Sequence, residues 1–439
     1  MERAEPGIVE VPFREALAFW VWLGFVNFGG PTGQISLMHT ELVERRRWIG
    51  ERRFLHALNF AMLLPGPEAH QLAIYVGWLL NGSPGALVAG LFFLLPAFVL
   101  MIALSWLFAV HGDVTWVAGV FEGLAWGVVG IVAAALLNIG ARALRGPLPT
   151  AIAVAAFLAL FMFGVPFPVV LLGAGAIGLV AAGRLARETD ASRNDAAFER
   201  VRPSLPRTAR VLAVGLAIWL VPLGLVVAAD PEGILAQEAL FFSTMALVTF
   251  GGAYAVLAYV QQAAVVRFGW LSSSEMAVGL SLAETTPGPL ILVVVFVGFL
   301  GAYRDPGSLP AGAAGVAGAL VTAWATFVPS FLFIFLGAPS VERLRGRVRL
   351  AGALAAITAA VVGVIANLAV VFATSVLFDQ VRTTTPAGHE IALPVWSSVV
   401  PLAVVVAIAA FVAIRRFRIN VAWVVLGAGV VGLGEVLVG

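Results

Sequence analysis

Cysteine and lysine are both missing from this chain of 439 residues. Without cysteine there can be no disulfide and no thiolate metal site. Without lysine there can be no phosphate-binding P-loop, because that motif uses its lysine to reach the nucleotide phosphates. The 26 residues of the Lys+Arg count are therefore all arginines. ATP hydrolysis through a P-loop is excluded.

Charged residues and metal-binding patterns are scarce as well. Only 11% of the residues are charged, whereas about a quarter are charged in a soluble globular protein. The sequence has no His-Glu-x-x-His pair and no acidic cluster suited to a metal. We therefore expect no metal, no cofactor and no enzyme activity, and the net charge of +2 gives no sign of nucleic-acid binding.

Apolar stretches fill most of the chain, which is 61% hydrophobic. Runs of roughly 17 to 25 residues, as at 87–110 and 350–378, are long enough to cross the ~30 Å hydrocarbon layer of a lipid bilayer. The composition therefore predicts an all-α polytopic membrane protein.

One short motif interrupts these stretches twice. Pro65-Gly66-Pro67 recurs 222 residues later as Pro287-Gly288-Pro289. A single copy is typical of an ordinary turn, but further landmarks share the spacing, which indicates a duplicated unit. They are Phe28-Gly29-Gly30 with Phe250-Gly251-Gly252, Arg45 with Arg267, and Trp48 with Trp270. Beyond residue 307 the spacing becomes 233, as between Pro96 and Pro329, because the second half has an insertion.

The duplication predicts four segments. Residues 1–183 form a first transporter repeat, 184–210 a cytoplasmic Arg-rich linker, 211–229 a connecting transmembrane helix, and 230–439 a second repeat. A single extra span between the repeats makes the second enter the membrane upside down. Inverted-topology repeats with broken helices are found in many secondary transporters.

The segments around each Pro-Gly-Pro are too short to span the bilayer alone. Residues 54–64 reach only about 16 Å as a helix, so 54–80 and 271–302 either form re-entrant hairpins or cross as broken helices. Hairpins keep the Arg clusters at 45–53, 142–145 and 184–210 on the cytoplasmic side, as the positive-inside rule favours. We expect hairpins and a cytoplasmic N-terminus.

Helix N-termini follow these breaks and predict an anion site. The half-helices after Pro31, Pro67, Gly252 and Pro289 begin with unpaired N–H groups at the positive end of a helix dipole, which favours an anion. The alternative is that the breaks are kinks that let helices pack.

Several charged residues are candidates beside that site. Arg45 and Arg267 are candidates for attracting or gating the anion, although Arg45 also fits a membrane flank. An ionisable group inside a membrane is a functional hypothesis by default. The candidates for proton coupling are His39, Glu68, Glu122 and Glu284. Glu68 has the alternative of complementing the dipole of its own helix.

The ordered motifs resemble the chromate ion transporter family in its long, two-domain form. The residues that carry the likeness are Asn27–Ile35, Glu41–Glu44, Trp48–Ile49, Leu63–Leu72 and Tyr75–Leu80. Two positions depart from the pattern: Ala253 stands where the first repeat has Pro31, and His70 stands where related sequences often have glutamine.

The resemblance implies chromate efflux across a prokaryotic inner membrane, which confers chromate resistance, with sulfate as a related oxyanion. The residues expected to bind substrate are Gly29, Gly30, Pro31, Gly33, Gln34, Pro65, Gly66, Pro67, Glu68, Gly251, Gly252, Pro287, Gly288 and Pro289. The expected mechanism is alternating access, with a proton or sulfate as the coupling ion. A passive anion channel, a permease for sulfate or another oxyanion, and a homodimeric assembly remain open.

Overall fold

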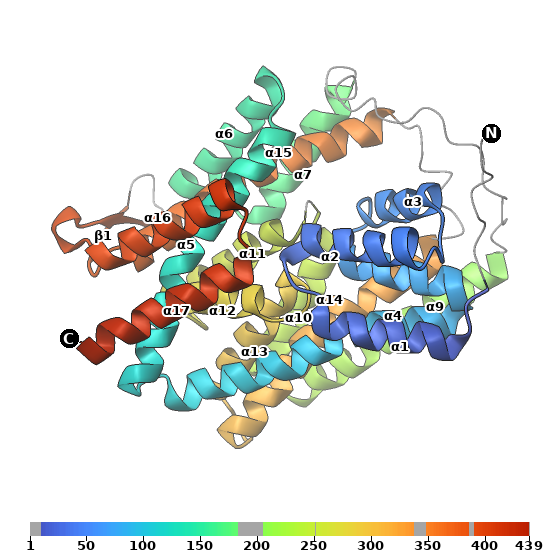
Figure 1. Cartoon of the computed structure of the whole chain (residues 1–439), viewed down its shortest axis with the longest axis horizontal. Helices are drawn as coiled ribbons and strands as arrows, with labels where there is room; N and C mark the ends of the chain where they lie inside the picture. The colour runs from blue at the N-terminus through green and yellow to red at the C-terminus, as the bar shows by residue number, and fades with distance from the viewer. Residues whose placement is uncertain (1–9, 183–204, 251, 338–347, 386–389, 439) are drawn as a thin grey trace. The chain divides into compact units, whose positions relative to one another are not determined.

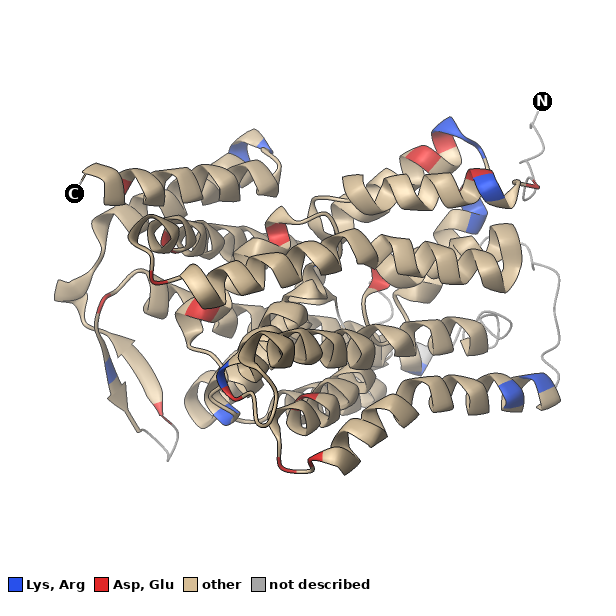
Figure 2. Ribbon diagram, turned by 90° about the horizontal axis from the view of Figure 1, so that it is seen from below, with Lys and Arg blue, Asp and Glu red and all other residues tan. Residues whose placement is uncertain are grey.

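The computed structural model describes residues 10–182, 205–250, 252–337, 348–385 and 390–438. In these parts the chain is almost entirely helical (Figure 1), with one two-stranded hairpin. Six of its described helices are long and apolar enough to cross a membrane. Long stretches of helix carry no charged residue at all (Figure 2). The predicted all-α polytopic architecture is confirmed.

The chain forms two compact units, and each unit takes segments from both halves of the sequence. Unit 1 covers residues 1–103, 192–253 and 286–345. Its elements are α1 (Phe13–Val26), α2 (Gly30–His39), η1 (Thr40–Arg45), α3 (Glu51–Ala61), the first part of α4 (Glu68–His111), α9 (Leu205–Ala229), α10 (Ile234–Val248), η4 (Leu290–Leu292), α13 (Val293–Arg304) and α14 (Ala311–Gly337). Within it α14 packs against α9, α10 and α13.

Unit 2 holds the remaining residues. Its elements are the end of α4, α5 (Thr115–Ala143), α6 (Pro147–Phe163), α7 (Phe167–Val180), α11 (Ala253–Gln261), η3 (Gln262–Arg267), α12 (Ser273–Thr285), α15 (Val348–Val376), β1 (Val381–Thr384), β2 (Ile391–Pro394), η7 (Trp396–Ser398), α16 (Pro401–Phe417) and α17 (Val421–Val438). The antiparallel strands pair Val381 with Pro394, and α15 packs against α5, α6 and α7.

The division into two repeats, a linker and a connecting helix stays a prediction. The connecting helix predicted at 211–229 is α9, which the structure describes from Leu205. Most of the Arg-rich linker lies outside the described residues. Because the compact units mix both halves, the two repeats are not two separately packed bodies.

Helix α4 is in fact two helices with a sharp turn between them. Asn81 and Gly82 have non-helical backbone angles, and Gly82 has a positive φ of 62°. The two helices pack closely beside this turn, because a Cβ placed on Gly77 of the first would lie 2.6 Å from the Ala89 Cβ of the second. The segment after Pro67 therefore ends at this turn and is too short to cross a bilayer.

Two π-helical turns occur at the repeat spacing. η1 and η3 are each six residues long, and π-helical turns are rare and often found at functional sites. After each turn a tryptophan N–H bonds back to a carbonyl, from Trp48 to Leu42 at 2.9 Å and from Trp270 to Ala264 at 2.7 Å. The duplication in the sequence thus has a matching backbone shape, which we call the first and second corner (residues 39–51 and 261–273).

Glycine lets α7 approach α15 closely, and we expect its replacement to be costly. A Cβ on Gly178 would lie 2.6 Å from the Ala353 Cα, whereas a Cβ on Gly173, on the same helix, meets nothing within 4 Å. Overpacking of this kind costs about 1–3 kcal/mol. Gly178→Val should therefore lower the thermal unfolding midpoint of the detergent-purified protein clearly more than Gly173→Val. Equal midpoints would show that this contact does not limit stability.

Candidate functional site

The two Pro-Gly-Pro motifs are held by a reciprocal pair of backbone hydrogen bonds in unit 1. The Gly66 N–H donates to the Thr249 carbonyl at 3.0 Å, and the Gly288 N–H donates to the Asn27 carbonyl at 2.9 Å. Asn27 and Thr249 occupy the same position in the two repeats, immediately before Phe-Gly-Gly. Each Pro-Gly-Pro is therefore bound to the other repeat. We call these four residues the glycine crossing.

A second pair of contacts follows the same exchange. A Cβ on Gly66 would lie 3.5 Å from the Ser330 Oγ, and a Cβ on Gly288 would lie 2.6 Å from the Ala97 Cβ. Ala97 and Ser330 match at the second spacing, 233. Such an exchange of contacts between equivalent positions is what a two-fold relation produces. The residue pairs related by a spacing of 222 and the pair related by a spacing of 233 therefore all lie around Gly66 and Gly288.

Glycine is needed at the centre of the crossing for conformation as well as for space. Gly66 has φ 112° and Gly288 has φ 148°, values that side-chain-bearing residues rarely adopt. Because their N–H groups already have carbonyl partners, these two glycines do not supply donors to a ligand. This narrows the predicted anion site to the first turns of the helices that follow.

Helix starts lie at the predicted positions around the crossing. α2 begins at Gly30 with Gly29 in the left-handed conformation and Pro31 in its first turn. α4 begins at Glu68, directly after Pro67. Gly252 precedes α11, and Pro289 precedes the η4 turn that leads into α13. First-turn N–H groups have no partner within their helix. Gly33 bonds back to the Gly29 carbonyl, and Gly251 lies outside the described residues.

Two glutamines brace the motif carbonyls. The Gln34 side-chain Nε2 donates to the Gly288 carbonyl at 2.5 Å, and the Gln71 Nε2 donates to the Pro65 carbonyl at 2.6 Å. Their Oε1 atoms are buried and have no partner in the described structure. The matching positions of the second repeat are Val256 and Val293. The amide groups of the crossing therefore come from the first repeat.

Asn27 is a site residue that sequence reasoning missed. Its side chain is fully buried, and neither Nδ2 nor Oδ1 has a partner among the described residues. An unpaired buried amide costs free energy, so Asn27 is a candidate for ligand contact beside the crossing. The sequence carried a signal, because Asn27 is a polar residue at the end of an apolar helix and immediately before a repeated motif.

Glu238 on α10 was also missed, and it lies elsewhere in unit 1. It is fully buried, and neither carboxyl oxygen has a partner in the described structure. A Cβ on Gly318 of α14 would lie 2.9 Å from its Oε2. The equivalent position in the first repeat is Ala16, so no repeated motif pointed to this acid.

The predicted ionisable residues are not gathered at one point. Glu68 is at the crossing, since its Oε1 would lie 3.4 Å from a Cβ on Gly252, and it contacts its own backbone N–H. His39 instead pairs with Glu51 at 2.6 Å in the first corner. In unit 2 Glu284 accepts a hydrogen bond from the Tyr254 hydroxyl at 2.8 Å, and Glu122 on α5 is exposed.

Removing the Gln34 amide should destabilise the crossing. Gln34→Leu leaves the buried Gly288 carbonyl without its side-chain donor, which costs about 1–3 kcal/mol. Gln237→Leu is the matched control, because the Gln237 side chain makes an exposed hydrogen bond to the Glu232 carbonyl. We expect a lower thermal unfolding midpoint for Gln34→Leu than for Gln237→Leu. If the midpoints fall equally, Gln34 does not brace the motif.

Comparisons with known proteins agree with the motifs. The chromate transporter family model matches residues 14–179 and 236–433. The chain is 31% identical over 427 residues to a chromate transport protein of Pseudomonas aeruginosa, which covers 96% of this chain and 92% of that protein. It is 28% identical over 368 residues to a chromate transport protein of Cupriavidus metallidurans, covering 83% and 84%. No solved structure matches the chain. The matched segments contain both Pro-Gly-Pro motifs, and the chain belongs to the chromate transporter family.

Proposed function

We propose that this protein is a secondary transporter that moves chromate across the membrane, with the glycine crossing as its central site. The observation that carries the proposal is the reciprocal hydrogen bonding of Gly66 and Gly288, since it brings both broken segments together in one unit. Family membership and the names of the relatives support chromate as the substrate.

Backbone chemistry explains why such a site suits an oxyanion. Broken helices inside a membrane need a protein or water environment for their freed polar groups. Here the carbonyls are taken by Gln34, Gln71 and the glycine N–H groups, which leaves first-turn N–H groups and the Asn27 amide as donors. Such donors at a positive dipole end favour a tetrahedral dianion. Sulfate has the same shape and charge and is the natural competitor.

Alternating access and inverted topology belong to the same proposal. Each repeat contacts the Pro-Gly-Pro of the other through one backbone hydrogen bond, a link weak enough to break and reform during a rearrangement of the repeats. The N-terminus is cytoplasmic, the direction is efflux across the inner membrane, and resistance to chromate is the result. Glu68, beside Gly252, is the coupling group that a proton would use.

Transport into everted membrane vesicles tests the proposal. We expect labelled chromate to accumulate against its gradient when a proton gradient is imposed, with sulfate as a competitor. Accumulation above equilibrium requires coupled transport, whereas purely downhill flux at high rate would identify a passive anion channel. Uptake of sulfate without chromate would identify a permease for another oxyanion.

Substitution of the two central glycines should abolish uptake. In Gly66→Val a new Cβ would lie 2.9 Å from the Gln71 Nε2, and in Gly288→Val 2.6 Å from the Ala97 Cβ. The control is Gly307→Val, where φ is also positive but nothing lies within 4 Å. Overpacking of about 1–3 kcal/mol would displace the residues of the crossing, so uptake should be lost at membrane levels equal to the control. Normal uptake by either variant would contradict the site assignment.

Asn27 should show opposite effects on stability and transport. Asn27→Leu removes two unpaired buried atoms at similar volume, so the unfolding midpoint should stay equal or rise. Asn81→Leu, in contrast, removes a hydrogen bond from Nδ2 to the Val11 carbonyl and should lower the midpoint. Chromate uptake should fall roughly tenfold for Asn27→Leu, because a loss of about 1.4 kcal/mol in binding free energy corresponds to a factor of ten. A destabilised Asn27→Leu with full uptake would show that Asn27 is structural.

A further inference from the structure

The first and second corners share a backbone but differ in charge. In the first corner His39 Nε2 pairs with Glu51 at 2.6 Å, and Arg45 pairs with Glu41 at 2.6 Å. At the positions of His39 and Glu51 the second corner has Gln261 and Ser273, and they form the same contact as a neutral hydrogen bond of 3.0 Å. The geometry of this contact is kept, while its ion pair is lost.

The difference leaves Arg267 without an acid on its own corner. The positions that hold Glu41 and Glu44 in the first corner hold Ala263 and Val266 in the second. Arg267 is exposed, and its guanidinium lies 4.8 Å from the centre of the Phe268 ring. Arg45, by contrast, shares Glu41 with Arg46. Of the two matched arginines, only Arg267 therefore presents an uncompensated positive charge at its corner.

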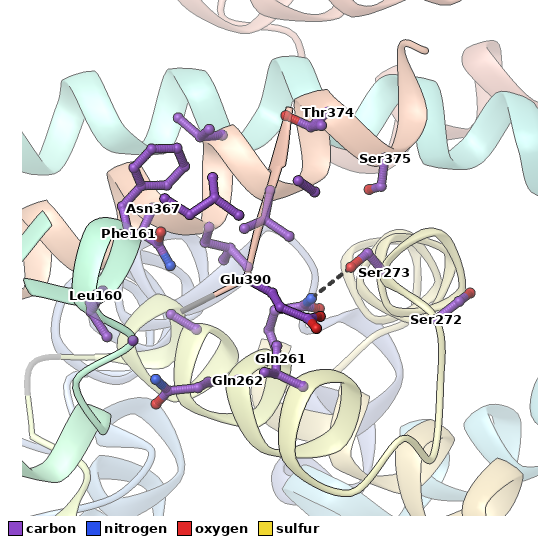
Figure 3. A pocket seen from close by; sticks show the side chains of 18 of the residues that line it. Leu160, Phe161, Gln261, Gln262, Ser272, Ser273, Asn367, Thr374, Ser375 and Glu390 are labelled. Carbon is purple, nitrogen blue, oxygen red and sulfur yellow. Dashed lines mark hydrogen bonds between the residues drawn. The ribbon is translucent and has the colours of Figure 1, made fainter. Parts of the chain in front are cut away.

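Arg267 lines a cavity of about 800 Å³ within unit 2. Figure 3 shows this cavity, with Gln261 and Ser273 on one wall and Thr374 and Ser375 on another. The walls come from the turn between α6 and α7, from α11 and η3, from α15 and from the β1–β2 hairpin. Its hydroxyl and amide groups belong to Tyr259, Gln261, Gln262, Ser272, Ser273, Ser274, Asn367, Thr374 and Ser375. These are the donors that an oxyanion uses besides a guanidinium.

Two of these groups lie where α11 meets the π-helical turn η3, Gln261 at the end of α11 and Gln262 at the start of η3. Gln262 accepts a hydrogen bond from the Phe167 N–H at 2.9 Å and donates to the Val165 carbonyl at 3.2 Å, so it fixes the α6–α7 turn to the cavity wall. Gln261 is only 5% exposed, and its Oε1 has no partner among the described residues. A buried polar atom without a partner at the wall of a roomy cavity is suited to bind water or ligand.

We propose that this cavity is a vestibule that binds a hydrated tetrahedral oxyanion from solution, an inference that rests on the proposed oxyanion transport. At about 30 Å³ per water the cavity exceeds one small anion many times over, so the anion keeps most of its hydration shell. Binding there is weak, electrostatic and sensitive to salt. The first corner, with its paired charges, is not such a site.

Two carboxylates also line the cavity and oppose an anion. Asp379 and Glu390 lie on and beside the β1–β2 hairpin, and both are exposed. Neither forms an ion pair with Arg267 in the described structure, so water screens all three charges. The balance between Arg267 and these two acids therefore sets the affinity of the vestibule, and removal of either acid should strengthen anion binding.

Kinetics of labelled chromate and sulfate uptake test the vestibule. Arg267→Gln should raise KM roughly threefold to tenfold at low ionic strength, because a dianion loses its attraction to one cation, and the maximal rate should stay unchanged. Val266→Glu should act in the same direction, with Val266→Gln as its neutral control; Val266 is 66% exposed. Glu390→Gln should lower KM. In 1 M salt these differences should vanish.

Two controls separate the possible failures. Arg142→Gln removes an exposed arginine of unit 2 that does not line the cavity, and its KM should equal that of the parent. If Arg267→Gln behaves like Arg142→Gln while the parent transports chromate, the vestibule is disproved and the central site stands. If the parent transports neither anion, the proposed function is wrong. Equilibrium binding of sulfate to the purified protein then tests the vestibule separately: loss of binding in Arg267→Gln would support the vestibule, and unchanged binding would disprove it.

Discussion

Backbone groups freed from a helix inside a membrane must find partners, because lipid offers none. In this protein each Pro-Gly-Pro breaks a helix, and each motif forms a backbone hydrogen bond to the other repeat. The Gly66 N–H donates to the Thr249 carbonyl, and the Gly288 N–H donates to the Asn27 carbonyl. The side chains of Gln34 and Gln71 donate to the Gly288 and Pro65 carbonyls. The need for glycine at positions 66 and 288 follows from this one arrangement.

A duplicated backbone does not imply a duplicated chemistry. The two corners share a π-helical turn and the same back-bonding tryptophan, yet one holds ion pairs and the other amides and hydroxyls. The crossing shows the same divergence, since Gln34 and Gln71 of the first repeat are replaced by valines at the equivalent positions of the second. A transporter with two equal halves would treat its two sides alike. In the proposed vestibule, the different charges at equivalent positions let the second corner receive an anion, whereas the first corner serves only structure.

Prediction succeeded where a constraint is local or repeated. The starts of α2 and α4 followed from Gly29, Pro31 and Pro67, since proline and glycine limit the backbone wherever they stand. Prediction missed Asn27 and Glu238, since burial without a partner is a property of the packed neighbours. It also grouped Arg45 with Arg267, although Glu41 stands four residues before Arg45 and pairs with it, whereas the second repeat has Ala263 at that position.

By itself the sequence determined the membrane class, the duplication with its two spacings, and the family, because each rests on composition or on the order of motifs along the chain. Only the tertiary structure decided that both Pro-Gly-Pro motifs meet in one unit, that the compact units mix both halves, and that Arg267 opens onto a cavity. The reason is physical: hydrogen bonds between residues more than 180 positions apart depend on how helices pack, and no local pattern encodes that packing.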